Sequence, residues 1–135
     1  MLNKAQERRL SSSLRIVEDS LREIDRMIEA SDYSAILKEV KHDVPEKTQA
    51  AIRNKLSLIR NKIEIITEGF NLSKTQIESS RYIRTKLSHC WQVLEDAKTI
   101  KLKRFGETSR EVEDTLDPQI NEIIDIVQEM EHLFG

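Results

Sequence analysis

Two of the three histidines follow a glutamate by three residues, as Glu39/His42 and Glu129/His132. On a helix this spacing places the carboxylate and the imidazole on one face. In carboxylate-bridged two-metal bundles such pairs project inward from two helices, and each of the other two helices supplies a further Glu. The apolar stripes of this chain contain no Glu at their centres, so we expect no metal site and no cofactor.

A second candidate is the segment Arg84-Thr85-Lys86-Leu87-Ser88-His89. It resembles the pattern of an Arg, a four-residue gap and a His that is typical of HEPN-type helical-bundle ribonucleases. The resemblance implies metal-free RNA cleavage at a dimer interface, carried by Arg84 and His89. Thr85 stands where that family commonly has Asn, Asp or His. On one continuous helix, a five-residue step separates the two side chains by about 140°, which favours two surface residues over a site.

The only Trp and the only Cys are neighbours, Trp91 and Cys90. Their place beside an apolar stripe predicts core positions, and a large ring such as Trp91 is also suited to a subunit contact. A single Cys excludes an intramolecular disulfide. The sequence has no phosphate-binding glycine loop, zinc-ligand cluster or catalytic serine motif, so we expect no enzymatic activity.

Charge is unevenly distributed along the chain. Residues 45–105 hold 13 Lys/Arg against 6 Asp/Glu, whereas residues 106–135 hold one Arg against nine acids. A basic cluster, defined as Lys98, Lys101, Lys103 and Arg104, is followed at once by acidic residues, which favours internal neutralisation. The alternative is a basic patch for nucleic acid or an acidic partner.

Composition indicates a helical protein. Only three Gly, two Pro and 4% aromatic residues disfavour sandwiches and barrels. The 135 residues predict one domain, 1–135. The N-terminus lacks a secretory apolar core, and no apolar run approaches the roughly 20 residues that span a bilayer, so we expect a cytoplasmic protein without contact with a membrane.

Two amphipathic helices are predicted in the first half of the chain. The first spans about residues 3–30, and a short amphipathic helix capped by Ser31 or Asp32 follows over 33–41. The second begins after Asp43, which with Glu46 fits a capping box. Their apolar residues alternate in steps of four and three: Leu10, Leu14, Val17, Leu21, Ile24 and Ile28, then Ile52, Leu56, Ile59, Ile63, Ile66 and Phe70.

Two further helices are predicted in the second half. Asn71 in a left-handed conformation and a Ser73/Gln76 capping box indicate a turn of about three residues before a helix over 73–105, which ends at Gly106. Residues 107–116 fit either a loop or a short helix. The last helix is predicted to begin at Asp117-Pro118. The stripes are Ile77, Ser80, Ile83, Leu87, Cys90, Leu94 and Ala97, then Ile120, Ile123, Val127, Met130 and Phe134.

Four such helices with short connections predict an all-α fold, an up-down antiparallel four-helix bundle with a short extra helix between helices 1 and 2. The function we expect is that of a non-catalytic interaction or structural module, which forms a homodimer or binds a protein through a helix face. Trp91 and the basic cluster are the candidate contact residues. The alternative is an RNA-binding or HEPN-like RNA-processing bundle that uses Arg84, His89 and the basic cluster.

Overall fold

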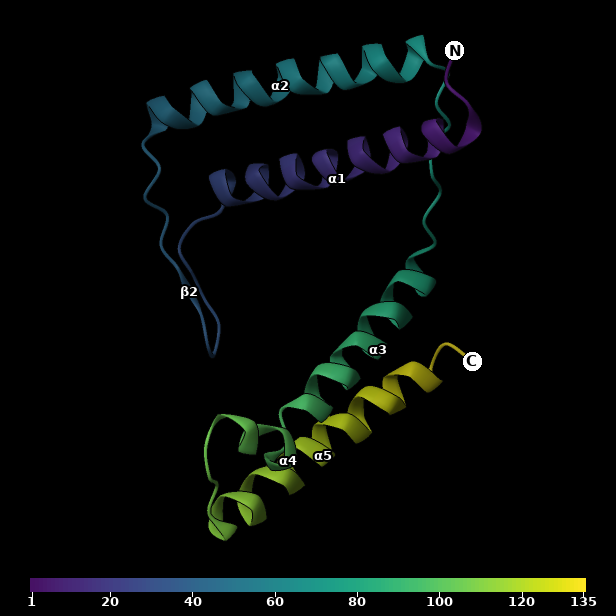
Figure 1. Cartoon of the computed structure of the whole chain (residues 1–135). Helices are drawn as coiled ribbons and strands as arrows, with labels where there is room; N and C mark the ends of the chain where they lie inside the picture. The colour runs from purple at the N-terminus through teal and green to yellow at the C-terminus, as the bar shows by residue number, and fades with distance from the viewer. The chain divides into compact units, whose positions relative to one another are not determined.

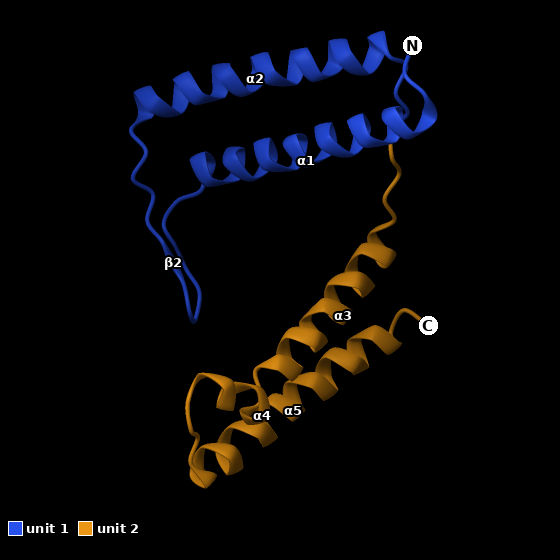
Figure 2. Cartoon of the chain, viewed as in Figure 1, with its two compact units in different colours: residues 1–74 blue, residues 75–135 orange.

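The computed structural model describes residues 1–135, which form two compact units, Met1–Lys74 (unit 1) and Thr75–Gly135 (unit 2) (Figures 1 and 2). The chain is mostly helical, so the all-α prediction is confirmed, with one small two-stranded sheet added. None of its helices combines the length and apolarity needed to cross a membrane. Each unit is a pair of long antiparallel helices joined by a shorter connection (Figure 1).

Helix α1 spans Lys4–Glu29, close to its predicted bounds. A capping box fixes its start, because the Gln6 amide donates to Asn3 Oδ1 at 2.8 Å and the Asn3 amide donates to Gln6 Oε1 at 2.9 Å. This reciprocal pair satisfies amides that have no partner within the helix.

A β-hairpin replaces the predicted short helix at 33–41. Strands β1 (Tyr33–Ser34) and β2 (Glu39–Val40) pair antiparallel, with Tyr33 opposite Val40. Ile36 and Leu37 at the turn are almost fully exposed, so no apolar burial would compensate for the cost of nucleating a nine-residue helix. Asp32 does not cap a helix; its Oδ1 accepts from the His42 amide at 2.8 Å across the base of the hairpin.

Helix α2 spans Glu46–Gly69. The predicted capping box with Asp43 does not form, since Pro45 holds the N-cap position and no side chain accepts from the first turn. At the other end Asn71 has a φ of 53°, as predicted, and the Leu72 amide donates to Thr67 O at 2.9 Å. This left-handed closure satisfies a carbonyl that the helix leaves unpaired.

Helix α3 spans Ser79–Asp96, so it begins six residues later than predicted and the three-residue turn at 71–73 is wrong. Residues 72–78 are non-helical. The only large apolar residue of the expected first turn, Ile77, is 64% exposed. A cap is worth about 1 kcal/mol, which does not compensate for ordering a turn that buries nothing.

The predicted helix over 73–105 is also interrupted at Ala97-Lys98. Helix α4 (Thr99–Leu102) and the 3-10 turn η1 (Lys103–Phe105) follow the interruption. In a continuous helix the Thr99 amide would donate to the carbonyl of Glu95. It donates instead to Asp117 Oδ1 at 3.0 Å, and Thr99 Oγ1 donates to Asp117 Oδ2 at 2.7 Å. Gly106, with a φ of +151°, ends this segment, as predicted.

Helix α5 spans Arg110–His132, so the predicted start at Asp117-Pro118 is wrong and most of 107–116 is helical. Ser109 is the N-cap, and its Oγ accepts from the Val112 amide at 3.3 Å. Pro118 lies inside the helix, where it removes one backbone hydrogen bond. Asp117 is therefore a mid-helix residue that caps α4 from outside rather than the cap of its own helix.

Each unit buries its own stripe of aliphatic side chains. The unit 1 core is Leu21, Ile28, Leu56 and Ile63, with Leu14 and Ile52 packed against it. In unit 2 the buried residues are Leu87, Thr99, Ile120, Ile124 and Val127. Two helices thus cover each other in each unit.

Candidate functional site

His42 lies beside a shallow depression at the end of unit 1 where α1 meets the base of the β-hairpin. His42 Nε2 is 2.7 Å from Ile28 O, a carbonyl in the last turn of α1. Because a carbonyl only accepts, Nε2 carries the proton and donates. A nitrogen that carries a proton cannot accept, so the 3.4 Å approach of Gln49 Nε2 to His42 Nε2 is not a hydrogen bond. Gln49 Nε2 donates instead to Val44 O at 2.9 Å. The other lining residues are Glu29, Ala30, Ser31, Asp32 and Arg53.

This arrangement gives His42 a structural connection between two elements. The imidazole satisfies an end carbonyl of α1, and its backbone amide is held by Asp32. The sequence analysis did not predict this role. The signal was the position of Asp32 and His42, two polar residues on either side of residues 33–41, where they can join the two ends of a hairpin.

The residues considered for metal binding do not form a site. Glu39 lies in β2 and not on a helix, so its three-residue spacing to His42 does not place the two on one helical face. Glu129 and His132 are both exposed in the last turns of α5 in unit 2. Nowhere in the chain do three His, Cys, Asp or Glu side chains converge as metal ligands would.

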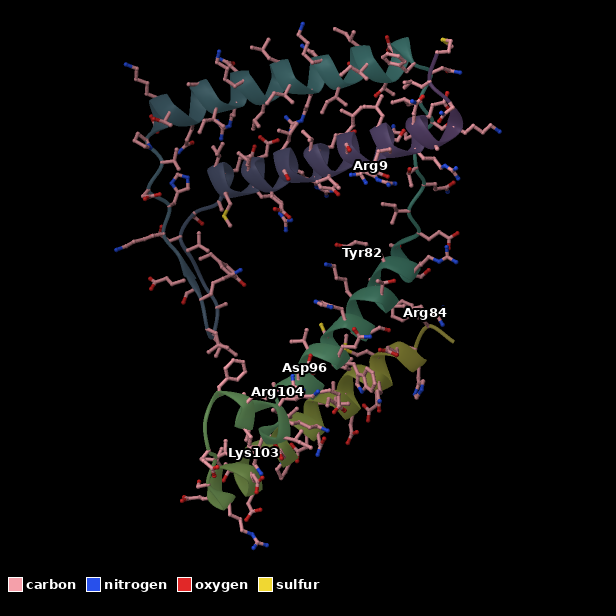
Figure 3. The ribbon with its side chains drawn as sticks, viewed as in Figure 1. Arg9, Tyr82, Arg84, Asp96, Lys103 and Arg104 are labelled. Atoms are coloured by element: carbon pink, nitrogen blue, oxygen red, sulfur yellow. The ribbon has the colours of Figure 1, made fainter.

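Arg84 and His89 both lie on α3 and are exposed (Figure 3 labels Arg84). Neither has a hydrogen bond or an ion pair that would orient it, and the five-residue step directs them to different sides of the helix. The arrangement within unit 2 therefore offers no preorganised acid–base pair of the kind that RNA cleavage requires.

Half of the basic cluster is neutralised within unit 2. Lys103 Nζ is 2.8 Å from Glu113 Oε1, and this contact raises the pKa of Lys103. Lys98 Nζ is 3.1 Å from Glu95 Oε2. Lys101 and Arg104 have no acidic partner. Figure 3 labels Lys103 and Arg104, which lie directly after α4. Two unpaired cations give only a weak, strongly salt-dependent attraction for nucleic acid.

The carboxylate of Asp117 has a pKa below its ordinary value. Hydrogen bonds from the amide and then the hydroxyl of Thr99 hold its pKa below the ordinary 3.8, with Lys98 and Lys103 adding to the effect. Thr99 is only 2% exposed. The pair closes the α4–α5 corner, and no nucleophile or second base faces it, so its role is to position α4.

The long helices leave half of each apolar stripe uncovered. In α1, Leu21 and Ile28 are 4% exposed, whereas Val17 and Ile24, which alternate with them, are 41% exposed. In α2, Leu56 is buried and Ile59 is 41% exposed. In α5, Ile120 is 6% exposed while Ile123 and Met130 are 47% and 43% exposed. In α3, Leu87 is buried, and Ile83 and Cys90 are exposed.

These uncovered residues define one face on each hairpin. At about 100° per residue they lie roughly 40–80° round each helix from the buried stripe, in the same rotational sense in all four helices. Because the helices of a hairpin run antiparallel (Figure 1), an equal rotation brings both stripes to the same side. We name them the unit 1 open face (Val17, Ile24, Ile59) and the unit 2 open face (Ile83, Cys90, Ile123, Met130).

The core positions predicted for the neighbouring Trp and Cys are not reached within unit 2. Cys90 is exposed on the unit 2 open face, and Trp91 remains 37% exposed on the other edge of the buried stripe. Sequence periodicity identified the stripe but not which part of it the partner helix covers.

We compared the chain with protein families, curated proteins and solved structures. No protein-family model, curated protein or solved structure matches this chain.

Proposed function

We propose that this protein is a non-catalytic helical interaction module that acts through its two open faces. Each open face receives a second layer of two helices, so that the completed unit is a four-helix core of up-down antiparallel hairpins. The same helix-face contact serves self-association or the binding of a protein partner. A core closed in this way would also make residues 1–135 one domain.

The observation that supports the proposal is the alternation of buried and half-exposed residues along every long helix. A helix that packs against one neighbour needs only a narrow apolar seam, and a helix of a bundle needs a wider stripe. Here the stripe is wide and the hairpin partner covers one edge of it. The remaining edge fits a second neighbour, as in a four-helix bundle.

The apolar area is sufficient to drive association. The six large aliphatic side chains of the open faces retain about 40–47% of their exposure, and covering them corresponds to about 4–8 kcal/mol. A further row of exposed residues lies beyond each open face: Ile16, Met27 and Leu58 in unit 1, and Tyr82, Val93 and Ile126 in unit 2. Covering this row adds roughly 5–10 kcal/mol, which brings the sum into the range that offsets the cost of association.

Cys90 allows a direct test, because it is the only thiol and belongs to the unit 2 open face. We expect its reaction with a thiol reagent to be at least tenfold slower in the native protein than in urea. Ile123→Asp should restore fast reaction while helix content by circular dichroism is unchanged. Ile100→Asp, in α4 and 75% exposed, is the matched control and should leave the reaction slow.

Native Cys90 that reacts as fast as in the unfolded chain would show that the unit 2 open face stays uncovered. That result would remove the proposed function, whatever the oligomeric state.

A further inference from the structure

We infer that the unit 1 open face binds an amphipathic helix of another protein, one whose apolar stripe is bordered by acidic residues. The inference rests on the proposed function, because it requires that this face be covered by a helical layer. The new element is the charge of the helix that lies along α2.

Two lysines of α2 border the unit 1 open face. Lys55 and Lys62 lie about 40–60° round the helix from Ile59, on the side away from the buried Leu56. Both lysines are exposed, and neither forms an ion pair within the chain. A helix that covers Ile59 therefore also passes close to two positive charges, which are two helical turns or about 10.5 Å apart.

The corresponding positions of α1 offer these lysines no acidic partner. At the same step of about 40–60° beyond the open-face residues of α1 stand Ser13, Ser20 and Met27. The opposite edge of the hairpin differs, because there Asp25 of α1 pairs with Arg60 of α2. The two helices thus match charges on one edge and leave the edge beside the open face positive.

The other open face of the chain does not supply the missing carboxylates. The row that borders the unit 2 open face at the same step contains one more lysine and no acid: Lys86 and Val93 of α3, with Gln119, Ile126 and Leu133 of α5. Pairing the unit 1 open face with either open face of a copy would bring no carboxylate from a bordering row to Lys55 or Lys62. This favours another protein as the occupant.

The combination of aliphatic residues and lysines favours an acidic amphipathic helix. A nucleic acid would leave the aliphatic side chains uncovered, and a contact with an anionic bilayer would be served by cations on both helices, whereas α1 has none in this row. A helix with Glu or Asp seven residues apart covers the apolar residues and brings carboxylates to Lys55 and Lys62. Such rows of charge beside an apolar seam determine partner choice in helical assemblies.

Two synthetic helical peptides test this preference on the full-length chain. Both are about three heptads long and have leucine seams, and they carry either glutamate or lysine at every seventh position beside the seam. We expect the glutamate peptide to bind at least about tenfold more tightly at low salt, measured by fluorescence anisotropy. The difference should shrink as the salt concentration rises, because the charges are exposed.

Charge reversal locates the preference. Lys55→Glu with Lys62→Glu should reverse the order of the two peptides, because the lysine peptide then meets carboxylates. Lys38→Glu with Lys41→Glu, the same charge change in and after the β-hairpin, is the matched control and should leave the order unchanged.

The apolar part of the contact is tested by a second pair of variants. Ile59→Asp should weaken the binding of both peptides at least about tenfold, with helix content by circular dichroism unchanged. Ile65→Asp, on the far side of α2 and 61% exposed, should bind both peptides as the wild type does.

Four outcomes would overturn the inference. The first is equal affinity for the two peptides, and the second is a preference that survives the Lys55→Glu, Lys62→Glu change. The third is displacement of the glutamate peptide by phosphatidylserine vesicles, which would indicate a membrane surface as the occupant. The fourth is failure of both peptides to bind; slow reaction of Cys90 would then leave the proposed function standing on self-association, and fast reaction of Cys90 would remove both proposals.

Discussion

The two units bury their apolar residues in the same way, but the connections between their helices are held by different side chains. Unit 1 and unit 2 each bury a stripe of aliphatic residues between two antiparallel helices. In unit 1 the connection is tied by His42 to a helix-end carbonyl and by Asp32 to the His42 amide. In unit 2 it is tied by Asp117, a carboxylate in the middle of α5, to Thr99.

Because the connections differ, the stability of the two units should respond differently to pH and to mutation. The ion pair between α1 and α2, Asp25–Arg60, is partly exposed and contributes little, so unit 1 depends on apolar burial and on hydrogen bonds at its end. Unit 2 depends in addition on a charged carboxylate whose partner is buried. We therefore expect mutations and pH to separate the two units.

The largest expected effect comes from a charge placed in the unit 1 core. Ile63 is 8% exposed, and Ile63→Asp would bury a carboxylate without a partner, at a cost of at least about 3 kcal/mol. We expect α1 and α2 to lose amide protection in hydrogen exchange. Ile36→Asp, at the exposed hairpin turn, should leave the exchange pattern as it is.

The same experiment sharpens the comparison between the units. If the open faces of both units contribute to one four-helix core, destabilising unit 1 should also loosen α3 and α5. Full protection of unit 2 in the Ile63→Asp protein would show that the hairpins fold independently. A melting curve within a few degrees of wild type would contradict the assignment of Ile63 to the core.

The long helices were predictable because their information is local. The four- and three-residue steps identified the stripes. Asn71 and Gly106, residue types that tolerate a positive φ, identified the end of α2 and the end of the 3-10 turn η1. The connections were not predictable, because they depend on residues distant in sequence. Thr99 meets Asp117 across 18 residues, and this contact interrupts the expected long helix.

For the open faces, the sequence predicted which residues belong to the apolar stripes but not which of them are buried. Periodicity identified the apolar seam residues, including Cys90, but it assigned them all to a core. Whether a seam residue is buried depends on how many helices pack beside it, and the spacing within one helix carries no such information. His42 was singled out for its nearness to Glu39, yet its structural partner is a backbone carbonyl that no residue type reveals.

An effect of intermediate size is expected in acid and concerns unit 2. The hydrogen bonds from Thr99 lower the folded-state pKa of Asp117 below 3.8. A carboxylate with a depressed folded pKa stabilises the fold above its unfolded pKa, near 4, and this contribution disappears as pH falls through the folded pKa. Unit 2 should therefore lose stability below about pH 4.

Asp117→Asn tests the source of this acid sensitivity. The variant should melt several degrees lower at pH 6 and should show a smaller further loss between pH 4 and pH 2.5. Asp114→Asn, one turn away and exposed, is the control and should keep the wild-type pH profile. Equal pH profiles for Asp117→Asn and wild type would show that the Thr99–Asp117 contact does not stabilise unit 2.

The smallest expected effect belongs to the unit 1 connection. His42→Leu removes the donor to Ile28 O and should cost about 1 kcal/mol, the net value of one hydrogen bond in a partly exposed position. Because the imidazole ties the hairpin base to α1, the loss should be local: faster exchange of the Ala35 and His42 amides, with the exchange of α2 unchanged. Glu39→Leu, in exposed β2, makes a comparable polar-to-apolar change without removing this hydrogen bond. If both variants accelerate exchange equally, the connection is held by strand pairing alone, and the contrast between a histidine-tied unit and a carboxylate-tied unit disappears.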